Sequence, residues 1–105
     1  MENKSYQLRY LPIFEQDLIS TANYIADVLK NEDAALCLID DIEAAILERR
    51  NNPVAFEPYR SAKKRDYPYY RIYVRNYVVY YVVIDDVMEV RRLLYGARNI
   101  ENLLN

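Results

Sequence analysis

Residues Tyr69 to Arg98 read YYRIYVRNYVVYYVVIDDVMEVRRLLYGAR, and their pattern indicates the fold class. Two short turns, Arg75-Asn76 and Asp85-Asp86, divide it into three runs rich in Val, Ile and Tyr: Tyr69–Arg75, Tyr77–Ile84 and Val87–Tyr95. Runs of this composition between turn residues are typical of β-strands, and short turns join antiparallel neighbours. We therefore expect a three-stranded antiparallel meander whose middle strand is apolar on both faces and covered on both sides.

The half of the chain before this stretch shows helical periodicity. From Ile13 to Lys30 and from Ala34 to Arg50, apolar residues recur every three or four positions, which places them on one face of a helix. The expected core-facing residues are Phe14, Leu18, Ala22, Ile25 and Leu29 in the first helix, and Ala35, Leu38, Ile39, Ile42, Ala45 and Ile46 in the second. The polar link Asn31-Glu32-Asp33 can cap the second helix, and its shortness predicts an antiparallel helix hairpin.

The two ends of the chain complete the predicted fold. Ser5–Leu11 alternates roughly in polarity and predicts a first strand, and Asn99–Leu104 predicts a short terminal helix. The expected class is α+β, with an N-terminal strand, an antiparallel helix hairpin, a three-stranded antiparallel meander and a short C-terminal helix. With 105 residues, 52% of them hydrophobic, we expect a single domain over residues 1–105.

The composition restricts the chemistry that the chain can perform. It has no histidine and one cysteine, Cys37, so any catalysis has to use Arg, Lys, Tyr, Asp or Glu. The pairs Asp40-Asp41 and Asp85-Asp86 do not predict metal sites, because neighbours on a helix diverge by about 100° and the second pair forms a turn. We expect no metal and no cofactor, and we expect Cys37 to act as a small hydrophobe beside the apolar stripe of the second helix.

Charge and hydropathy bear on location and partners. The N-terminal MENKSYQLRY lacks an apolar signal-peptide core, and no run approaches roughly 18 consecutive apolar residues, so we expect a cytoplasmic protein without a membrane partner. Residues 1–52 hold five basic and ten acidic side chains, whereas residues 53–105 hold nine basic and six acidic ones. The second half is therefore the expected binding half.

Strand alternation predicts a polar face on the first strand of the meander. Tyr70, Ile72 and Val74 should point toward the helices, and the intervening side chains should point away: Tyr69, Arg71, Tyr73 and Arg75. Interleaved Arg and Tyr suit phosphate clamping and base stacking, although a solvated face with cross-strand pairs has the same pattern. The preceding loop carries Lys63-Lys64-Arg65, so the candidate binding residues are Lys63, Lys64, Arg65, Tyr69, Tyr73 and Arg75.

The last strand adds a pair of arginines. Alternation predicts one face with Glu89, Arg91, Leu93 and Tyr95 and another with Val90, Arg92 and Leu94. We interpret the arginine pair as structural, with salt bridges to Asp85, Asp86 or helix carboxylates. Arg98 follows Gly96, where a strand end meets a loop.

The order of these elements resembles that of the RelE/ParE toxins of bacterial type II toxin–antitoxin systems. The resemblance covers nearly the whole chain, through the helical DLISTANYIADVLKNEDAALCLIDDIEAAI, the Asn-Pro after it and the tail VMEVRRLLYGARNIENLL. It implies one of two activities. RelE-like members cleave mRNA in the ribosome with a basic sheet surface, and ParE-like members lack that constellation and poison DNA gyrase.

The resemblance transfers to individual residues only in part. Arg71 and Arg98 fall where nuclease members carry basic residues, and Tyr95 falls where many relatives have His, so these three are the catalytic candidates of the nuclease alternative. Three positions depart from the RelE pattern, in which they hold lysine, arginine and tyrosine: Tyr73, Val78 and Leu104.

These departures, together with a pI near 5.1, favour a ParE-like toxin that acts on gyrase and is not an enzyme. The alternatives are a ribosome-dependent mRNA endonuclease and an inactive module that binds its antitoxin. The resemblance also implies a cognate antitoxin, a toxin–antitoxin hetero-oligomer, growth inhibition and plasmid stabilisation.

Overall fold

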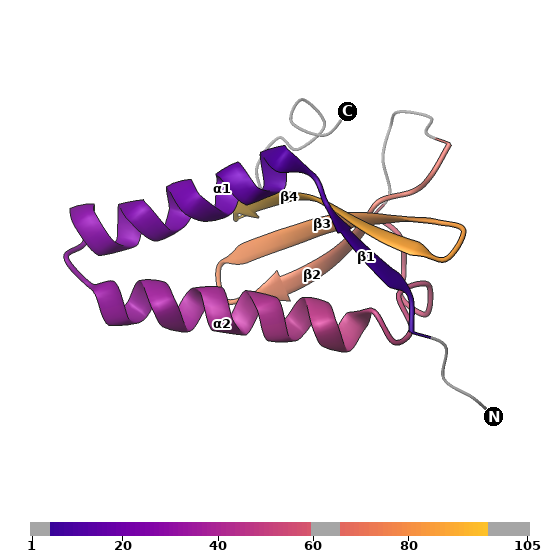
Figure 1. Cartoon of the computed structure of the whole chain (residues 1–105), viewed down its shortest axis with the longest axis horizontal. Helices are drawn as coiled ribbons and strands as arrows, with labels where there is room; N and C mark the ends of the chain where they lie inside the picture. Colours follow the sequence, from indigo (N-terminus) through magenta and orange to yellow (C-terminus); the bar gives the residue numbers. More distant parts are fainter. Residues whose placement is uncertain (1–4, 60–65, 97–105) are drawn as a thin grey trace.

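The computed structural model describes residues 5–59 and 66–96, which form a helix hairpin packed on one face of a four-stranded sheet (Figure 1). The helices are α1 (Pro12–Asn23) and α2 (Glu32–Arg49), and a π-helical turn, η1 (Tyr24–Val28), extends α1. The strands are β1 (Gln7–Tyr10), β2 (Tyr70–Val74), β3 (Tyr77–Ile84) and β4 (Val87–Tyr95). The predicted α+β class, hairpin and meander are confirmed, and the predicted C-terminal helix lies outside the described residues. None of the described helices combines the length and apolar composition that a membrane span needs.

The sheet has the order β1-β4-β3-β2. β2, β3 and β4 pair antiparallel, as predicted, whereas β1 pairs parallel to β4, with Gln7 opposite Val87 and Tyr10 opposite Val90. Parallel neighbours need a long crossover, which the helix hairpin supplies. β3 and β4 therefore become the two inner strands, and β2 and β1 form the edges.

The main core lies between the hairpin and the sheet. The stripe of α2 is buried as predicted at Ala35, Leu38, Ile42 and Ile46, and α1 contributes Phe14. The strands contribute Ile72, Val74, Val79, Tyr81, Met88, Val90 and Leu93 to this core. Asn31 caps α2 as predicted, because its side-chain oxygen accepts a hydrogen bond from the Ala34 N–H at 3.0 Å. Cys37, which was expected to lie beside this stripe, is exposed.

The predicted buried stripe of the first helix is wrong at Leu29, because a π-helical turn precedes this residue. Ile25 is 8% exposed, but Leu29, which the pattern places on the same face, is 56% exposed. In η1 the Leu29 N–H donates to the carbonyl of Tyr24, five residues earlier, at 3.2 Å. A π turn holds one residue more than an α turn, so the side chains beyond it rotate away from the core.

The predicted faces of β4 are wrong beyond Arg91, because the strand contains a β-bulge there. Tyr81 lies opposite Val90 and Tyr80 lies opposite Arg92, so Arg91 has no partner on β3. An extra residue interrupts the two-residue alternation of a strand. Leu93 consequently joins Val90 on the side of the helices, and the prediction that it shares a face with Glu89 and Arg91 is wrong.

Candidate functional site

The sheet face that points away from the helices carries a second cluster of buried residues. Its members are Tyr69, Val78, Tyr80, Val82 and Leu94, with Tyr59 and Ile84 packed against them. The Tyr80 ring meets the rings of Tyr59 and Tyr69 edge to face, each at a centroid distance of 6.4 Å. Aromatic rings favour this arrangement, and here it joins Tyr59 and Tyr69 to Tyr80 of β3.

Arg71 lies on this outer face, as predicted. Its guanidinium carbon is 5.0 Å from the ring centroid of Tyr59 and 5.7 Å from that of Tyr73. Neutral rings attract the cation and position it without cancelling its charge. Within residues 5–59 and 66–96, no carboxylate forms an ion pair with Arg71. Its positive charge can therefore act on an anionic partner.

The two tyrosines predicted beside Arg71 differ in accessibility. Tyr73 is 65% exposed and can stack against a partner. Tyr69 is 2% exposed, because its ring turns into the outer cluster and its hydroxyl accepts a hydrogen bond from Arg91 at 3.3 Å. Tyr69 therefore packs beneath the surface, and its predicted role as an exposed stacking residue is wrong.

Arg75 leaves the outer face. It sits in the β2–β3 turn with φ of 57°, and the alternation of β2 ends before it. Its guanidinium instead forms an ion pair with Asp41 of α2, with an Nη2–Oδ2 distance of 2.6 Å. The prediction that Arg75 shares a face with Arg71 is therefore wrong.

The two arginines of β4 form salt bridges, as predicted. Arg92 pairs with Asp17 of α1 at 2.8 Å, a helix carboxylate. Arg91 pairs with Glu89 at 2.8 Å rather than with the aspartates of the turn, and the other oxygen of Glu89 accepts from Arg9 at 2.9 Å. Glu89 is only 6% exposed, so it is a buried carboxylate held between two guanidinium groups.

The environment of Glu89 predicts a pH dependence of stability. Burial alone would raise the pKa of Glu89, but the hydrogen bonds and charges of Arg9 and Arg91 outweigh it and hold this pKa below its usual value. A folded-state pKa below the unfolded one means that the ionised group stabilises the fold above the unfolded pKa, about 4.3 for Glu. This contribution is lost as the pH falls through the folded-state value.

We expect Glu89→Gln to lower the free energy of unfolding near neutral pH, and we expect the difference from wild type to shrink as the pH falls. Urea unfolding at a series of pH values from about 7 to about 3 measures this difference. A difference that is the same at every pH would contradict the role assigned to the ionised carboxylate.

Tyr95 lies on the opposite face of the sheet from Arg71. It pairs in register with Tyr77, and the two rings lie 5.2 Å apart at an interplanar angle of 71°. Both line a cleft with Ser20 and Thr21 of α1, on the side of the helices. Without the bulge at Arg91, Tyr95 would share the face of Glu89. The structure therefore separates two of the catalytic candidates, Arg71 and Tyr95.

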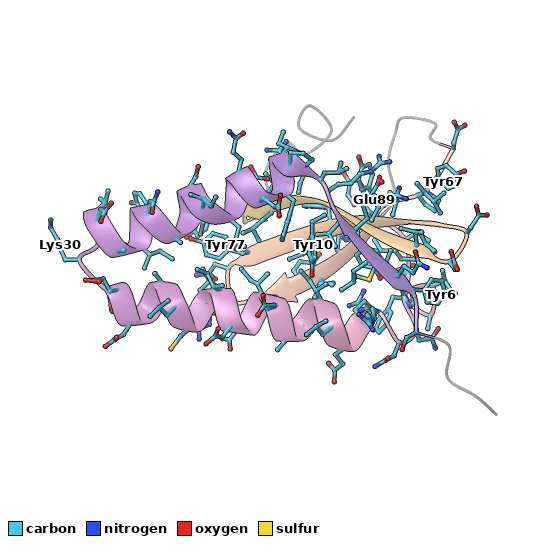
Figure 2. The ribbon with its side chains drawn as sticks, viewed as in Figure 1. Tyr6, Tyr10, Lys30, Tyr67, Tyr77 and Glu89 are labelled. Carbon is cyan, nitrogen blue, oxygen red and sulfur yellow. The ribbon has the colours of Figure 1, made fainter. Side chains whose placement is uncertain are left out.

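Figure 2 shows Tyr77, the partner of Tyr95, toward the end of the molecule that carries Lys30, and Glu89, the centre of the arginine pairs, toward the opposite end. The remaining candidates, Lys63, Lys64, Arg65 and Arg98, lie outside the described residues. Among the residues that the structure describes, no three acidic or cysteine side chains come close enough together to hold a metal ion.

Two features of the site were not predicted from the sequence. The first is Glu89 as the centre of an ion-pair cluster, for which a carboxylate between the apolar residues Met88 and Val90 is a signal. The second is the meeting of Tyr24 and Tyr77 with Tyr95. Their meeting depends on the π turn and on strand register, and neither has a clear sequence signal.

Comparisons with known proteins give consistent results. A family model described as the ParE toxin of the type II toxin–antitoxin system parDE matches residues 8–100. No curated protein matches the chain. A chain of the chromosomal ParDE system from P. aeruginosa is structurally similar, with a TM-score of 0.68 and 13% identity over 89% of this chain and 98% of that one.

Two structures from E. coli are also similar. YafQ from strain BL21(DE3) has a TM-score of 0.56 and 15% identity, covering 95% of this chain and 99% of its own. The E. coli DinJ-YafQ toxin–antitoxin complex gives a TM-score of 0.56 and 12% identity, covering 97% and 100%. At these identities the likeness concerns the fold.

Proposed function

This chain belongs to the ParE toxin family of type II toxin–antitoxin systems, and from that premise we propose that it inhibits bacterial growth by acting on DNA gyrase. In this proposal residues 1–105 act in the cytoplasm as one toxin domain, without enzymatic activity. A cognate antitoxin neutralises the toxin by forming a hetero-oligomer with it, and such a pair can stabilise a plasmid that encodes both.

The separation of Arg71 from Tyr95 is the observation that supports gyrase over mRNA as the target. Cleavage of an RNA strand needs charge stabilisation and a proton-transfer group at the same phosphate. Arg71 contacts Tyr59 and Tyr73 on the outer face, whereas Tyr95 pairs with Tyr77 on the helix-facing side. Two groups on opposite faces of a sheet cannot act on one phosphate.

The outer face is better suited to gripping a protein surface. Arg71 offers a positive charge between two aromatic rings, and Tyr73 offers an exposed ring. Arginine and tyrosine are enriched among the residues that dominate binding energy at protein interfaces. We propose that this pair contacts gyrase, and that Lys63, Lys64, Arg65 and Arg98 contribute positive charge to the interaction.

The helix hairpin supports the proposal of an antitoxin partner. A groove of about 150 Å³ between α1 and α2 is lined by Tyr10, Phe14, Glu15, Leu18, Ile39, Ile42, Glu43 and Ile46. Six of these eight residues are apolar, and the other two are carboxylates. This chemistry suits an amphipathic segment with apolar and basic side chains. We propose that the cognate antitoxin supplies this segment.

The test separates the targets in vitro. Purified toxin is added to a gyrase supercoiling reaction and, separately, to a reconstituted translation reaction in which mRNA ends are mapped. We expect inhibition of supercoiling and intact mRNA. We also expect Arg71→Ala to raise the inhibitory concentration at least about tenfold, because a charged contact is lost. Arg75→Ala, which removes an arginine already paired with Asp41, is the matched control, and we expect a change within about twofold.

The contrary outcomes are distinct. Cleavage of mRNA inside codons with unaffected supercoiling would replace gyrase poisoning by ribosome-dependent nuclease activity. Neither effect, together with normal growth of cells that express the chain alone, would leave an inactive antitoxin-binding module. If Arg71→Ala and Arg75→Ala changed the inhibitory concentration equally, Arg71 would not be part of the contact with gyrase.

A further inference from the structure

A second candidate site lies on the side of the sheet that carries the helices. A cleft of about 630 Å³ is lined by Ser20, Thr21, Tyr24, Leu29, Tyr77 and Tyr95. Its volume is within the range of protein ligand sites. Tyr24 and Tyr95 are each about half exposed, at 52% and 53%, and Tyr77 is partly buried between the sheet and the helices. Three phenol rings thus border one opening.

Besides the bulge that places Tyr95 on this face, two irregularities of the backbone lie beside the cleft. The π turn ends with Leu29 bonded to the carbonyl of Tyr24, and both residues line the cleft. Gly96, which follows the lining residue Tyr95, has φ of 67° and donates its N–H to the Asn76 carbonyl at 2.7 Å, which fixes the end of β4 beside the β2–β3 turn. π turns occur frequently at functional sites, and this one places Tyr24 beside Tyr77 and Tyr95.

The chemistry of the lining favours a cation. The rings of Tyr77 and Tyr95 are inclined at 71° with centroids 5.2 Å apart, so they form two walls of a corner. Burial raises the pKa of Tyr77, and nearby Tyr95 and Tyr24 raise it further, so this phenol stays neutral. Ring faces attract guanidinium and ammonium groups. The hydroxyl oxygens of Ser20 and Thr21 can accept hydrogen bonds from such groups.

An anion is a poorer fit. None of the described residues that line the cleft is basic, so a phosphate would find no partner of opposite charge among them. The helical walls also belong to the acidic half of the chain, residues 1–52, where ten acidic side chains outnumber five basic ones. A negative background attracts cations and repels nucleic acid.

We propose that this cleft binds an arginine side chain of a protein partner. The guanidinium lies against the rings of Tyr77 and Tyr95, Tyr24 closes the opening, and Ser20 and Thr21 accept its N–H groups. The volume admits the side chain together with part of the segment that carries it. The assignment holds whichever macromolecule the toxin inhibits.

The experiment titrates the full chain with N-acetyl-arginine methylamide and follows backbone amide signals by NMR. The matched probe is the citrulline analogue, which has nearly the same shape without the charge. We expect shifts at Ser20, Thr21, the start of β3 and the end of β4 that saturate with arginine at millimolar concentrations, about the affinity of a single side chain, and weaker shifts with citrulline.

Three substitutions test the rings. Tyr95→Leu should weaken arginine binding at least about threefold, whereas Tyr95→Phe should bind within about twofold of wild type, because the attraction comes from the ring. Tyr24→Leu provides a second ring deletion if Tyr95→Leu disturbs the sheet, and the amide spectrum of each variant shows whether it is folded. Tyr73→Leu, which removes an exposed ring from the other face, should leave binding unchanged.

Several results would overturn the proposal. Equal binding of citrulline would show that charge plays no part. If folded Tyr95→Leu and Tyr24→Leu bound arginine as well as wild type, the rings would not contribute to binding. If Tyr95→Phe lost binding, the hydroxyl group and not the ring would recognise arginine. Cleft shifts with uridine monophosphate but not with arginine would identify a nucleotide site instead. None of these readouts depends on gyrase, so they are independent of the test of toxicity.

Discussion

Replacing Ile42 with alanine is expected to lower the free energy of unfolding by about 2–5 kcal/mol. Ile42 is 1% exposed and lies in the buried stripe of α2, within the core between the hairpin and the sheet. Deleting its outer carbons removes apolar burial and leaves a cavity that the neighbours refill only partly. Because whole domains are stable by about 5–15 kcal/mol, this loss is a large share of the total. Urea unfolding followed by circular dichroism measures it.

The same helix offers a control. Leu47 is 47% exposed, so Leu47→Ala removes a similar volume from the surface of α2. We expect a change of about 0.5 kcal/mol or less. If the two substitutions were equally destabilising, the helix would not pack through the stripe that contains Ile42.

The fold could be predicted largely from periodicity. β3 and β4 have the predicted bounds, Tyr77–Ile84 and Val87–Tyr95, because apolar runs between short polar turns leave little choice of secondary structure. The second helix was predicted within two residues, since its stripe is regular and Asn31 supplies a cap. The edge position of β1 was not predictable, because its parallel pairing with β4 joins residues about 80 apart in the sequence.

Single-residue irregularities account for the errors in the predicted faces. The π turn moves Leu29 out of the core, and the bulge at Arg91 moves both Leu93 and Tyr95 from the face of Glu89 to the side of the helices. Each inserts one residue into a repeating pattern, and the pattern on either side of the insertion continues to look regular. Periodicity alone therefore cannot locate the change of phase.

The candidate site was predicted only where it depends on local alternation. Arg71 and Tyr73 lie in the middle of a regular strand and occupy the predicted face. Tyr69 and Arg75 flank that strand: Tyr69 lies on the predicted face but is buried in its cluster, and Arg75, in the turn, forms an ion pair with Asp41 on the side of the helices. Tertiary partners decide these end positions, and those partners come from distant segments such as α2.

The second large effect is expected at Asp17. One carboxylate oxygen of Asp17 accepts both from Arg92 Nε at 2.8 Å and from the Leu93 backbone N–H at 3.0 Å, and the other accepts from Arg92 Nη2 at 3.2 Å. β1 pairs with β4 only as far as Val90. Beyond that point Asp17 accepts the hydrogen bond of a β4 edge N–H, that of Leu93. This residue therefore joins α1 to the sheet and satisfies a strand N–H that β1 does not reach.

We expect Asp17→Ala to lower the free energy of unfolding by roughly 1–3 kcal/mol, because three hydrogen bonds to a carboxylate are lost and a strand N–H loses its acceptor. The side chains of Asp17 and Arg92 are 16% and 18% exposed, so water replaces these bonds only in part. Asp41→Ala is the matched control, since it removes an aspartate from an arginine pair that is about half exposed, at 48% and 53%.

Comparing Asp17→Ala with Asp41→Ala separates the effect of burial on stability from that of the charge pair alone. Exposed pairs contribute about 0–1 kcal/mol, so Asp41→Ala should destabilise the fold less than Asp17→Ala. Equal losses would mean that the Asp17 pair acts only as a surface salt bridge and that the Leu93 N–H finds another acceptor. A larger loss of unfolding free energy in Asp17→Ala, together with faster hydrogen exchange at its Leu93 amide, would identify the Asp17 carboxylate as the acceptor that protects this N–H at the edge of β4. Because Asp17 is one helical turn before Ser20 and Thr21, the same contact also fixes to the sheet the part of α1 that lines the cleft with Tyr77 and Tyr95.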